Sequence, residues 1–584
     1  MIMKMKTMVG IVAIGIAAAS WADVEIDLDM KAKPLKDMSN SGCNQGMGFN
    51  AALENVWGMA NDDYWFVTNK VEAARILKAA GANLLRLQCM NSWFWRRNPN
   101  PYDPNSKDPK EVQRYKGYKQ TNPKAAFDFY KANGIKVFVC LECHKPEMVD
   151  EDVEIVKWIV DNGYKDVVAG FEMGNETYSS PKYPSFAPYW KSFIDQAEKI
   201  WPKLPLGMNI GELFELNPDI VHMRNRLMSD EQIKRDWSHA GAYFSADNFN
   251  RYSMQFVQAM SNYVGKISHI IYHAYGCETP YSCSYHGFKR FRNFIEICPE
   301  LKGKKYWLTE IRQRSDEDNH CQRIFREMLI TAHYSLMALC QPETDGFCQH
   351  QLTALSGALY QSSGKDWFIQ WYDSSQDQLP DRMAPYNLPR MDVGQMGVMY
   401  RIFTQGIAEC PIFLAHGTEK GAGTNEWDYC CSARLADDVY ARRRAIKEGR
   451  TSGGFLGFGG GYPEVRGELE WVASTRRDGN KLCLLMVNSM SEPQTVRVTA
   501  KGKIFASPTY RTLSCPEEFV DCCEIPGEGR AWRQVSWEDS NQGFWGADMA
   551  AYKDLKPVAD TMTVTIKPHT VQTVTVMLRN APKK

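Results

Sequence analysis

The stretch DVEIVKWIVDNGYKDVVAGFEMGNE, residues 152–176, decides how the chain is expected to fold. In its first half the apolar residues recur three and four positions apart, which is typical of an amphipathic helix, and Gly163 supplies a stop signal. The run VVAGFEM is short and apolar apart from Glu172, which indicates a strand buried on both faces. It ends on Asn175 and Glu176, polar residues that a buried strand does not favour. The stretch predicts a helix, then a strand with polar groups at its carboxyl end.

The same alternation of helix-like and strand-like segments recurs between residues 46 and 410. The strands are expected within residues 46–50, 82–90, 135–144, 167–176, 205–214, 266–276, 304–313 and 344–352. Eight strands alternating with helices predict an α/β fold, a (β/α)8 TIM barrel over residues 46–410. An open, doubly wound sheet is the alternative, but no glycine-rich phosphate loop follows the first strand.

Residues 411–584 have a different pattern. Residues 469–502 alternate as strand, Asp478-Gly479 turn, strand, loop and strand, and residues 561–578 add further alternating runs. This pattern indicates a C-terminal β-sandwich domain. Residues 23–45 open with the alternating run DVEIDLDM, and we expect them to add an N-terminal strand to that sandwich. The chain would then start in the sandwich, pass through the barrel and return.

Residues 1–22 have the pattern of a secretory signal peptide. Lys4 and Lys6 precede a short apolar run, and Ser20 and Ala22 occupy a small-x-small cleavage site. The mature protein would begin at Asp23 and be secreted or periplasmic, with no membrane span after cleavage; a retained N-terminal anchor is the alternative. It would carry 67 basic against 69 acidic residues, a balance that gives no reason to expect a nucleic-acid partner.

The 17 cysteines are numerous, and export would permit disulfide bonds. Cys277 and Cys283 flank a short loop and are a plausible local pair. Cys140 and Cys143, next to His144, could suggest zinc, but no second CxxC pair follows at the required spacing. We therefore expect neither a metal nor another cofactor. Aromatic residues make up 12% of the chain and suit a sugar-binding cleft as well as an ordinary core.

Two glutamates are predicted to face each other across the mouth of the barrel. The site of such a barrel lies at the carboxyl ends of its strands. The fourth predicted strand ends in Asn175-Glu176, and the seventh carries Thr309-Glu310. These strands lie on opposite sides of the barrel. Two facing carboxyl groups about 5–5.5 Å apart are what retaining glycoside hydrolysis requires.

The motifs FEMGNE and YWLTE, in this order and 134 residues apart between their glutamates, resemble clan A of the retaining glycoside hydrolases. The closest patterns are the xylosidase, arabinofuranosidase and glucuronidase/heparanase branches, whose appended sandwich also resembles residues 472–490. The resemblance covers essentially the whole mature chain. It implies that Glu176 is the acid/base, that Asn175 binds a sugar hydroxyl and that Glu310 is the nucleophile.

Other residues fall at positions that the clan uses. Arg86 lies on the second predicted strand, where the clan keeps an arginine near the nucleophile, and an ion pair elsewhere is the alternative. His273 and Tyr275 end the sixth strand, where the clan often has an aromatic hydroxyl, and His144 ends the third strand and could line the cleft; each histidine could equally be a core residue. Glu142 and Glu172 are competing carboxylates, and Glu172 resembles a structural position of the family pattern.

The loop after the second predicted strand could determine specificity. Trp93 and Trp95 could stack on sugar rings, and Arg96 and Arg97 could bind sulfate or carboxylate groups, as could Arg312 and Arg314. Ordinary surface arginines are the alternative. The sequence thus predicts a carbohydrate partner and an exported hydrolase of β-glycosidic bonds, and these arginines suggest the hypothesis of an anionic glycan as substrate. A catalytically inactive carbohydrate-binding barrel is the competing hypothesis, and a metal-dependent barrel hydrolase is disfavoured because no ligand cluster stands out.

Overall fold

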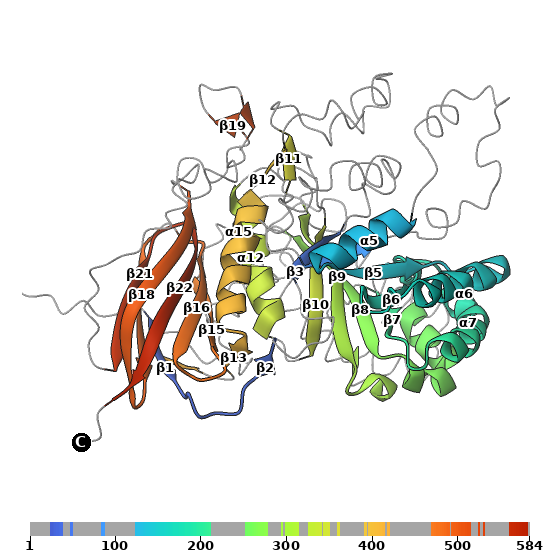
Figure 1. The fold of residues 1–584 in the computed structure, drawn as a ribbon, viewed down its shortest axis with the longest axis horizontal. Helices are drawn as coiled ribbons and strands as arrows, with labels where there is room; N and C mark the ends of the chain where they lie inside the picture. Colours follow the sequence, from blue (N-terminus) through green and yellow to red (C-terminus); the bar gives the residue numbers. More distant parts are fainter. Residues whose placement is uncertain are drawn as a thin grey trace, which may run out of the picture.

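The structure, a computed structural model, describes a barrel, a β-sandwich and the helices between them (Figure 1). It describes residues 24–38, 47–50, 83–87, 123–211, 251–277, 294–295, 298–314, 325–340, 343–350, 359–361, 391–393, 395–414, 417–420, 469–490, 492–515, 524–525, 530–531 and 560–581. The predicted signal peptide, the loop with Trp93 and Trp95, and Cys283 lie outside these residues.

Eight parallel strands close into a barrel, as predicted. They are β3 (Met47–Asn50), β4 (Leu84–Leu87), β5 (Lys136–Leu141), β6 (Val168–Met173), β7 (Leu206–Asn209), β8 (His269–Cys277), β9 (Lys305–Arg314) and β10 (Thr344–His350). Strand β10 pairs with both β9 and β3, so the sheet has no open edge.

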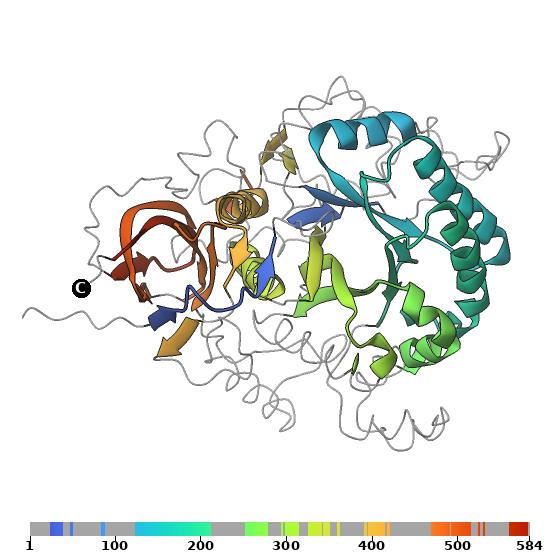
Figure 2. The same cartoon turned by 60° about the horizontal axis from the view of Figure 1, so that its bottom comes forward.

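Helices α5 (Pro123–Asn133), α6 (Pro146–Asp161) and α7 (Ala187–Ile200) run along the outside of the barrel, on the side away from the sandwich (Figure 2). Helix α6 begins with Pro146 at its first position, where a missing N–H costs nothing. It buries Val149, Ile155 and Ile159, which lie on one face. It ends before Gly163, whose φ of 72° suits glycine, so the predicted stop signal is confirmed.

One tryptophan fills the inside of the barrel. Trp307 on β9 packs in a buried cluster with Leu84, Phe138, Ala169, Ile271 and Cys348. Gly170 and Gly207 leave room for its indole ring, because a Cβ on Gly170 would lie 2.0 Å from Trp307 Cη2 and one on Gly207 2.7 Å from Trp307 Cε3. The indole ring of Trp307 therefore fills the barrel interior next to Gly170 and Gly207.

The sandwich consists of two sheets, and the N-terminal segment contributes to both of them. The four-stranded sheet has the order β14 (Gly417–Lys420), β1 (Val24–Leu28), β17 (Gln494–Ala500), β21 (Thr561–Ile566). The six-stranded sheet has the order β18 (Lys503–Ser514), β22 (Thr570–Asn580), β16 (Lys481–Asn488), β15 (Leu469–Thr475), β13 (Ile412–Phe413), β2 (Lys36–Asp37). The predicted N-terminal strand is β1, and β2 is an additional one.

Helices α12 (Phe325–Cys340) and α15 (Gln395–Glu409) lie between the barrel and the six-stranded sheet (Figure 1). A single hydrophobic cluster runs from the barrel helices through Leu336 and Phe403 to Leu485 and Val571 of the sandwich. Helix α15 precedes the predicted domain boundary at residue 410, yet it packs against sandwich strands. Among the described helices, none is both long and apolar enough to cross a membrane.

Several further elements are short. They are the 3-10 turns η1 (Thr177–Ser179), η2 (Tyr183–Phe186), η3 (Ser261–Lys266) and η4 (Pro299–Leu301), and the two small sheets β11 (Leu359–Gln361) with β12 (Met391–Val393) and β19 (Glu524–Ile525) with β20 (Arg530–Ala531). Of these, η1 and η2 directly follow the polar end of β6 and shape its surroundings.

Candidate active site

Arg86 on β4 connects three polar side chains at the mouth of the barrel. It is fully buried, and its Nε donates to Glu172 Oε1 and Oε2 at 2.9 and 2.8 Å. Its Nη1 donates to Glu310 Oε1 at 2.5 Å and its Nη2 to Asn175 Oδ1 at 2.8 Å. Burial alone would lower the pKa of Arg86, but the charges of Glu172 and Glu310 outweigh it and hold that pKa well above its ordinary value.

A tight turn after β6 presents Glu176. Gly174 has a φ of 89°, and a Cβ there would lie 2.6 Å from Thr177 Cγ2, so only glycine fits. Glu176 itself has φ 48° and ψ 29°, the left-handed region that is unfavourable for a non-glycine residue. The turn leaves the Glu176 side chain 40% exposed, whereas the Glu310 side chain is 4% exposed.

A bulge in β9 brings Glu310 into the mouth. Trp307 pairs with Ile271 and Glu310 with His273, so β9 advances three residues where β8 advances two. The same extra residue appears against β10. Without it, strict alternation would send Trp307 and Glu310 to opposite faces of the sheet. With it, Glu310 meets Arg86 while Trp307 fills the interior.

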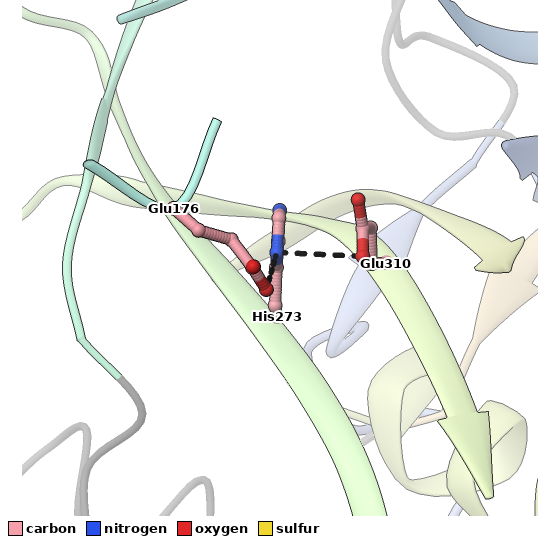
Figure 3. A group of neighbouring side chains, drawn as sticks. All are labelled: Glu176, His273 and Glu310. Carbon is pink, nitrogen blue, oxygen red and sulfur yellow. Dashed lines mark hydrogen bonds and ion pairs between the residues drawn. The ribbon is translucent and has the colours of Figure 1, made fainter. Parts of the chain in front are cut away.

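His273 on β8 lies between the two glutamates (Figure 3). Its Nδ1 lies 3.1 Å from Glu176 Oε1 and 3.6 Å from Glu310 Oε2. Burial would lower the pKa of His273, but Glu310 and Glu176 outweigh it and the pKa is raised. Burial would raise the pKa of Glu176, but the hydrogen bond and charge of His273 outweigh it, and the pKa is lowered. The Tyr178 hydroxyl also lies 3.5 Å from Glu176 Oε1.

The spacing of these three groups could also suit a metal ion. One ligand atom each from Glu176, His273 and Glu310 lie within 4.8 Å of one another. Arg86 already places a positive charge 2.5 Å from Glu310, however, and a divalent cation would sit beside that guanidinium. The charges therefore favour chemistry by the side chains themselves.

The structure brings together five of the predicted site residues: Arg86, Asn175, Glu176, His273 and Glu310. Glu172 is not a free carboxylate, since it forms a wholly buried ion pair with Arg86 at 2.7 Å.

The other predicted site residues are placed elsewhere or fall outside the described parts. His144 follows β5 and contacts the Phe186 ring, with 5.9 Å between ring centroids. Tyr275 lies on β8 opposite Arg312, and Cys277 lies opposite Arg314, but of their side chains nothing is described. Trp93 and Trp95 lie outside the described residues, as do Arg96 and Arg97.

Two residues near the site were not predicted. Asn209 ends β7 and contacts the backbone just before Glu176, and Tyr178 contacts Glu176 directly. The signal for Asn209 was a polar residue at the carboxyl end of a barrel strand, the same signal that marked Glu176. Tyr178 follows in the loop, where the sequence pattern carries no such signal.

No protein-family model matches the chain, and no curated protein sequence matches it. The class of fold is nevertheless clear, a (β/α)8 barrel with an attached β-sandwich, and solved structures share it.

The α-L-arabinofuranosidase of Thermotoga maritima superposes with a TM-score of 0.55 at 12% identity, covering 95% of this chain and 100% of the other. A family 51 α-L-arabinofuranosidase of Bifidobacterium longum gives a TM-score of 0.53 at 11% identity over 96% and 100% of the two chains. The family 51 arabinofuranosidase of Xanthomonas axonopodis pv. citri gives 0.52 at 11% over 95% and 100%. These likenesses confirm the predicted architecture along the whole length of those enzymes.

Proposed function

We propose that this protein is a retaining glycoside hydrolase. The observation that carries the proposal is the pair of glutamates at the barrel mouth, with a carboxylate oxygen of Glu176 within 4.8 Å of one of Glu310. Retaining enzymes hold their two carboxyl groups about 5–5.5 Å apart, whereas inverting enzymes need about 6.5–9.5 Å to admit a water molecule. The fold shared with arabinofuranosidases supports the same assignment.

In this mechanism Glu310 attacks the anomeric carbon and forms a glycosyl-enzyme intermediate. The Arg86 guanidinium at 2.5 Å favours the ionised, attacking carboxylate. Glu176 protonates the departing oxygen and then activates water for the second step. His273 keeps Glu176 ionised in the free protein. A bound sugar that excludes water from the mouth would favour the neutral acid, so protonation would follow substrate binding.

The proposed substrate is a β-linked glycan that carries sulfate or carboxylate groups. Arg312 and Arg314 lie beyond Glu310 on β9, and Arg96 and Arg97 follow β4 in the sequence. Guanidinium groups match the geometry of sulfate and carboxylate oxygens. Arg312→Ala should then raise KM on the anionic polymer, as should added salt, and neither change should affect a desulfated polymer.

The proposal includes export, based on residues 1–22. N-terminal sequencing of the protein released from its host cells should begin at Asp23. A leader that stays attached would support the anchored alternative.

A substrate panel followed by product stereochemistry tests the function. The panel should include β-xylosides, sulfated and uronate-bearing polymers, and α-L-arabinofuranosides because of the shared fold. NMR during the first turnovers should show a product with the anomeric configuration of its substrate. An inverted product would overturn the retaining mechanism, and glycan binding without turnover would establish the carbohydrate-binding alternative.

A further inference from the structure

Asn209 is a buried residue at the barrel mouth that lies outside the carboxylate pair. It is the last residue of β7, and none of its surface is exposed. Its Nδ2 donates to the carbonyl oxygen of Met173 at 3.3 Å and also to that of Gly174. The backbone carbonyl oxygen of Asn209 accepts a hydrogen bond from the Tyr183 hydroxyl at 2.6 Å. Asn209 is therefore hydrogen-bonded to the backbone that precedes Glu176 and to the side chain of Tyr183, which follows Glu176 in η2.

The turn that Asn209 contacts is strained. The left-handed backbone of Glu176 is unfavourable for a residue with a Cβ and persists only where neighbouring groups fix it. Gly174, with a φ of 89°, begins the same turn, and its carbonyl is one of the two that Asn209 binds. Tyr183, on the far side of the turn, is itself fixed by stacking on Phe256, with 4.0 Å between ring centroids. Asn209 thus connects the strained turn to strand β7 and, through Tyr183 of η2, to the stacked ring of Phe256.

The chemistry of this contact requires an amide. Both partners of the Asn209 side chain are carbonyl oxygens, which accept hydrogen bonds and donate none. An ionised aspartate would point its negative oxygens at these acceptors and would oppose the turn. A protonated aspartic acid could still donate one bond, so a variant at this position gains a pH dependence that alanine lacks.

We infer that Asn209 is a positioning residue for the acid/base, and that it holds the Gly174–Glu176 turn so that the Glu176 carboxyl group reaches the departing oxygen. The inference rests on the proposed acid/base role of Glu176. It assigns to β7 a function in catalysis, although β7 carries neither of the two glutamates.

The test compares substrates that need a proton donor with substrates that do not. The two are alkyl and activated aryl glycosides of the sugar that the panel identifies, since only the alkyl leaving group requires protonation. Asn209→Ala should lower kcat/KM on the alkyl glycoside about 10- to 100-fold, because misplacing a catalytic group by about 1 Å costs up to 10²-fold. On the aryl glycoside the change should stay within about threefold, because its departure does not depend on the acid. Asn209→Asp should recover part of its loss on the alkyl glycoside as the pH is lowered.

Asn488→Ala is the matched control. Asn488 is also fully buried, and its Nδ2 likewise donates to backbone carbonyl oxygens, but in the sandwich: those of Glu492 and Lys567 at 2.9 Å and that of Ile566 at 3.5 Å. Its removal should lower stability without any dependence on the leaving group. If Asn209→Ala does not fold, Tyr183→Phe tests the inference instead. It should lower kcat/KM on the alkyl glycoside more than on the aryl glycoside, by a smaller factor than Asn209→Ala.

Glu176→Gln distinguishes failure of the proposed acid/base role from failure of the positioning role of Asn209. If this variant shows no dependence on the leaving group, the acid/base assignment fails, and the inference fails with it. If Glu176→Gln shows the dependence while Asn209→Ala and Tyr183→Phe lower both substrates equally, only the inference is overturned.

Discussion

Two of the histidine–carboxylate clusters among the described residues use the same kinds of side chain in different ways. At the barrel mouth, His273 lies 3.1 Å from Glu176, whose side chain is 40% exposed. Between helix α12 and the sandwich, His333 Nδ1 lies 2.9 Å from Glu470 Oε2 and its Nε2 lies 3.0 Å from Ser489 Oγ. The second cluster has the serine, histidine and acid of a hydrolytic triad. Both His333 and Glu470 are fully buried, however, so no substrate reaches them.

The difference between the clusters is access to solvent rather than composition. His333 comes from a helix that follows the barrel strand β9, and Glu470 comes from the sandwich strand β15. A buried pair of this kind costs desolvation and contributes little net stability, but breaking it leaves one partner unsatisfied. Removing a member of the mouth cluster should therefore affect turnover, and removing a member of the buried cluster should affect folding.

The largest effect is expected from Glu310→Gln. The substitution keeps the shape of the side chain but removes the attacking oxygen, so kcat should fall about 10⁴-fold or more on every substrate. Steady-state kinetics measure this loss. Glu142→Gln, which changes the competing carboxylate after β5, is the control and should remain close to the unchanged protein. An active Glu310→Gln preparation would remove Glu310 as nucleophile.

A smaller and more selective effect is expected from Glu176→Gln. Its kcat/KM on substrates with poor leaving groups should fall about 10²- to 10⁴-fold, while activated aryl glycosides should react at nearly the same kcat/KM. A plot of log kcat/KM against leaving-group pKa measures the difference as a steeper slope. Equal losses across the series would move the acid role to Glu142 or Glu172.

Glu470→Gln tests the buried cluster. Loss of the carboxylate should lower the free energy of unfolding by about 1–3 kcal/mol, because the buried His333 then faces a neutral amide in place of the charged Glu470. Urea unfolding measures this change, and kcat/KM per folded molecule should stay constant. Glu25→Gln is the control, because Glu25 belongs to an exposed ion pair with Arg497 at 3.6 Å, and its removal should change the free energy by less than about 0.5 kcal/mol. Lost activity with unchanged stability would contradict the division between the clusters.

The smallest effect concerns pH. The folded-state pKa of His273 is raised, so its stabilising contribution is complete below the unfolded value of about 6.5 and is lost as the pH rises through the folded pKa. The pKa of Glu176 is lowered, so its contribution changes only in the acid range. Urea unfolding between pH 5 and 9 should show the unchanged protein losing its advantage over His273→Gln as the pH rises. A constant difference between the two would show that His273 does not titrate in this range.

The barrel and its two glutamates could be predicted because their signals are local. A strand buried on both faces reads as an apolar run, as in residues 167–173, and a polar residue at its end stands out. The bulge that orients Glu310 has no such signal, since Trp307, Leu308 and Thr309 read as an ordinary strand. Strand β2 has only two residues, Lys36 and Asp37, and is too short for a pattern.

Besides the bulge in β9 and the short strand β2, the sequence did not predict the contacts between distant segments. Asn209 and Gly174 come together only because β6 and β7 are neighbours in the closed barrel. His333 and Glu470 meet only after the sandwich packs on α12. A single sequence gives the residue types of such pairs but not their partners, because the choice of partner is made by the packing of whole elements.

The tryptophan inside the barrel has a consequence for tracing distant relatives of this chain. Trp307 tolerates no side chain at positions 170 and 207, so the three positions can change only together. A relative that keeps the tryptophan should keep both glycines. A relative with a smaller residue in its place should be free to carry alanine at position 170, and at position 207 if residue 271 is also smaller, because a Cβ on Gly207 would lie 2.8 Å from Ile271 Cδ1 as well. This covariation of three positions, on β6, β7 and β9, would be an inherited signature of the lineage, readable in alignments too divergent for any overall similarity to be seen.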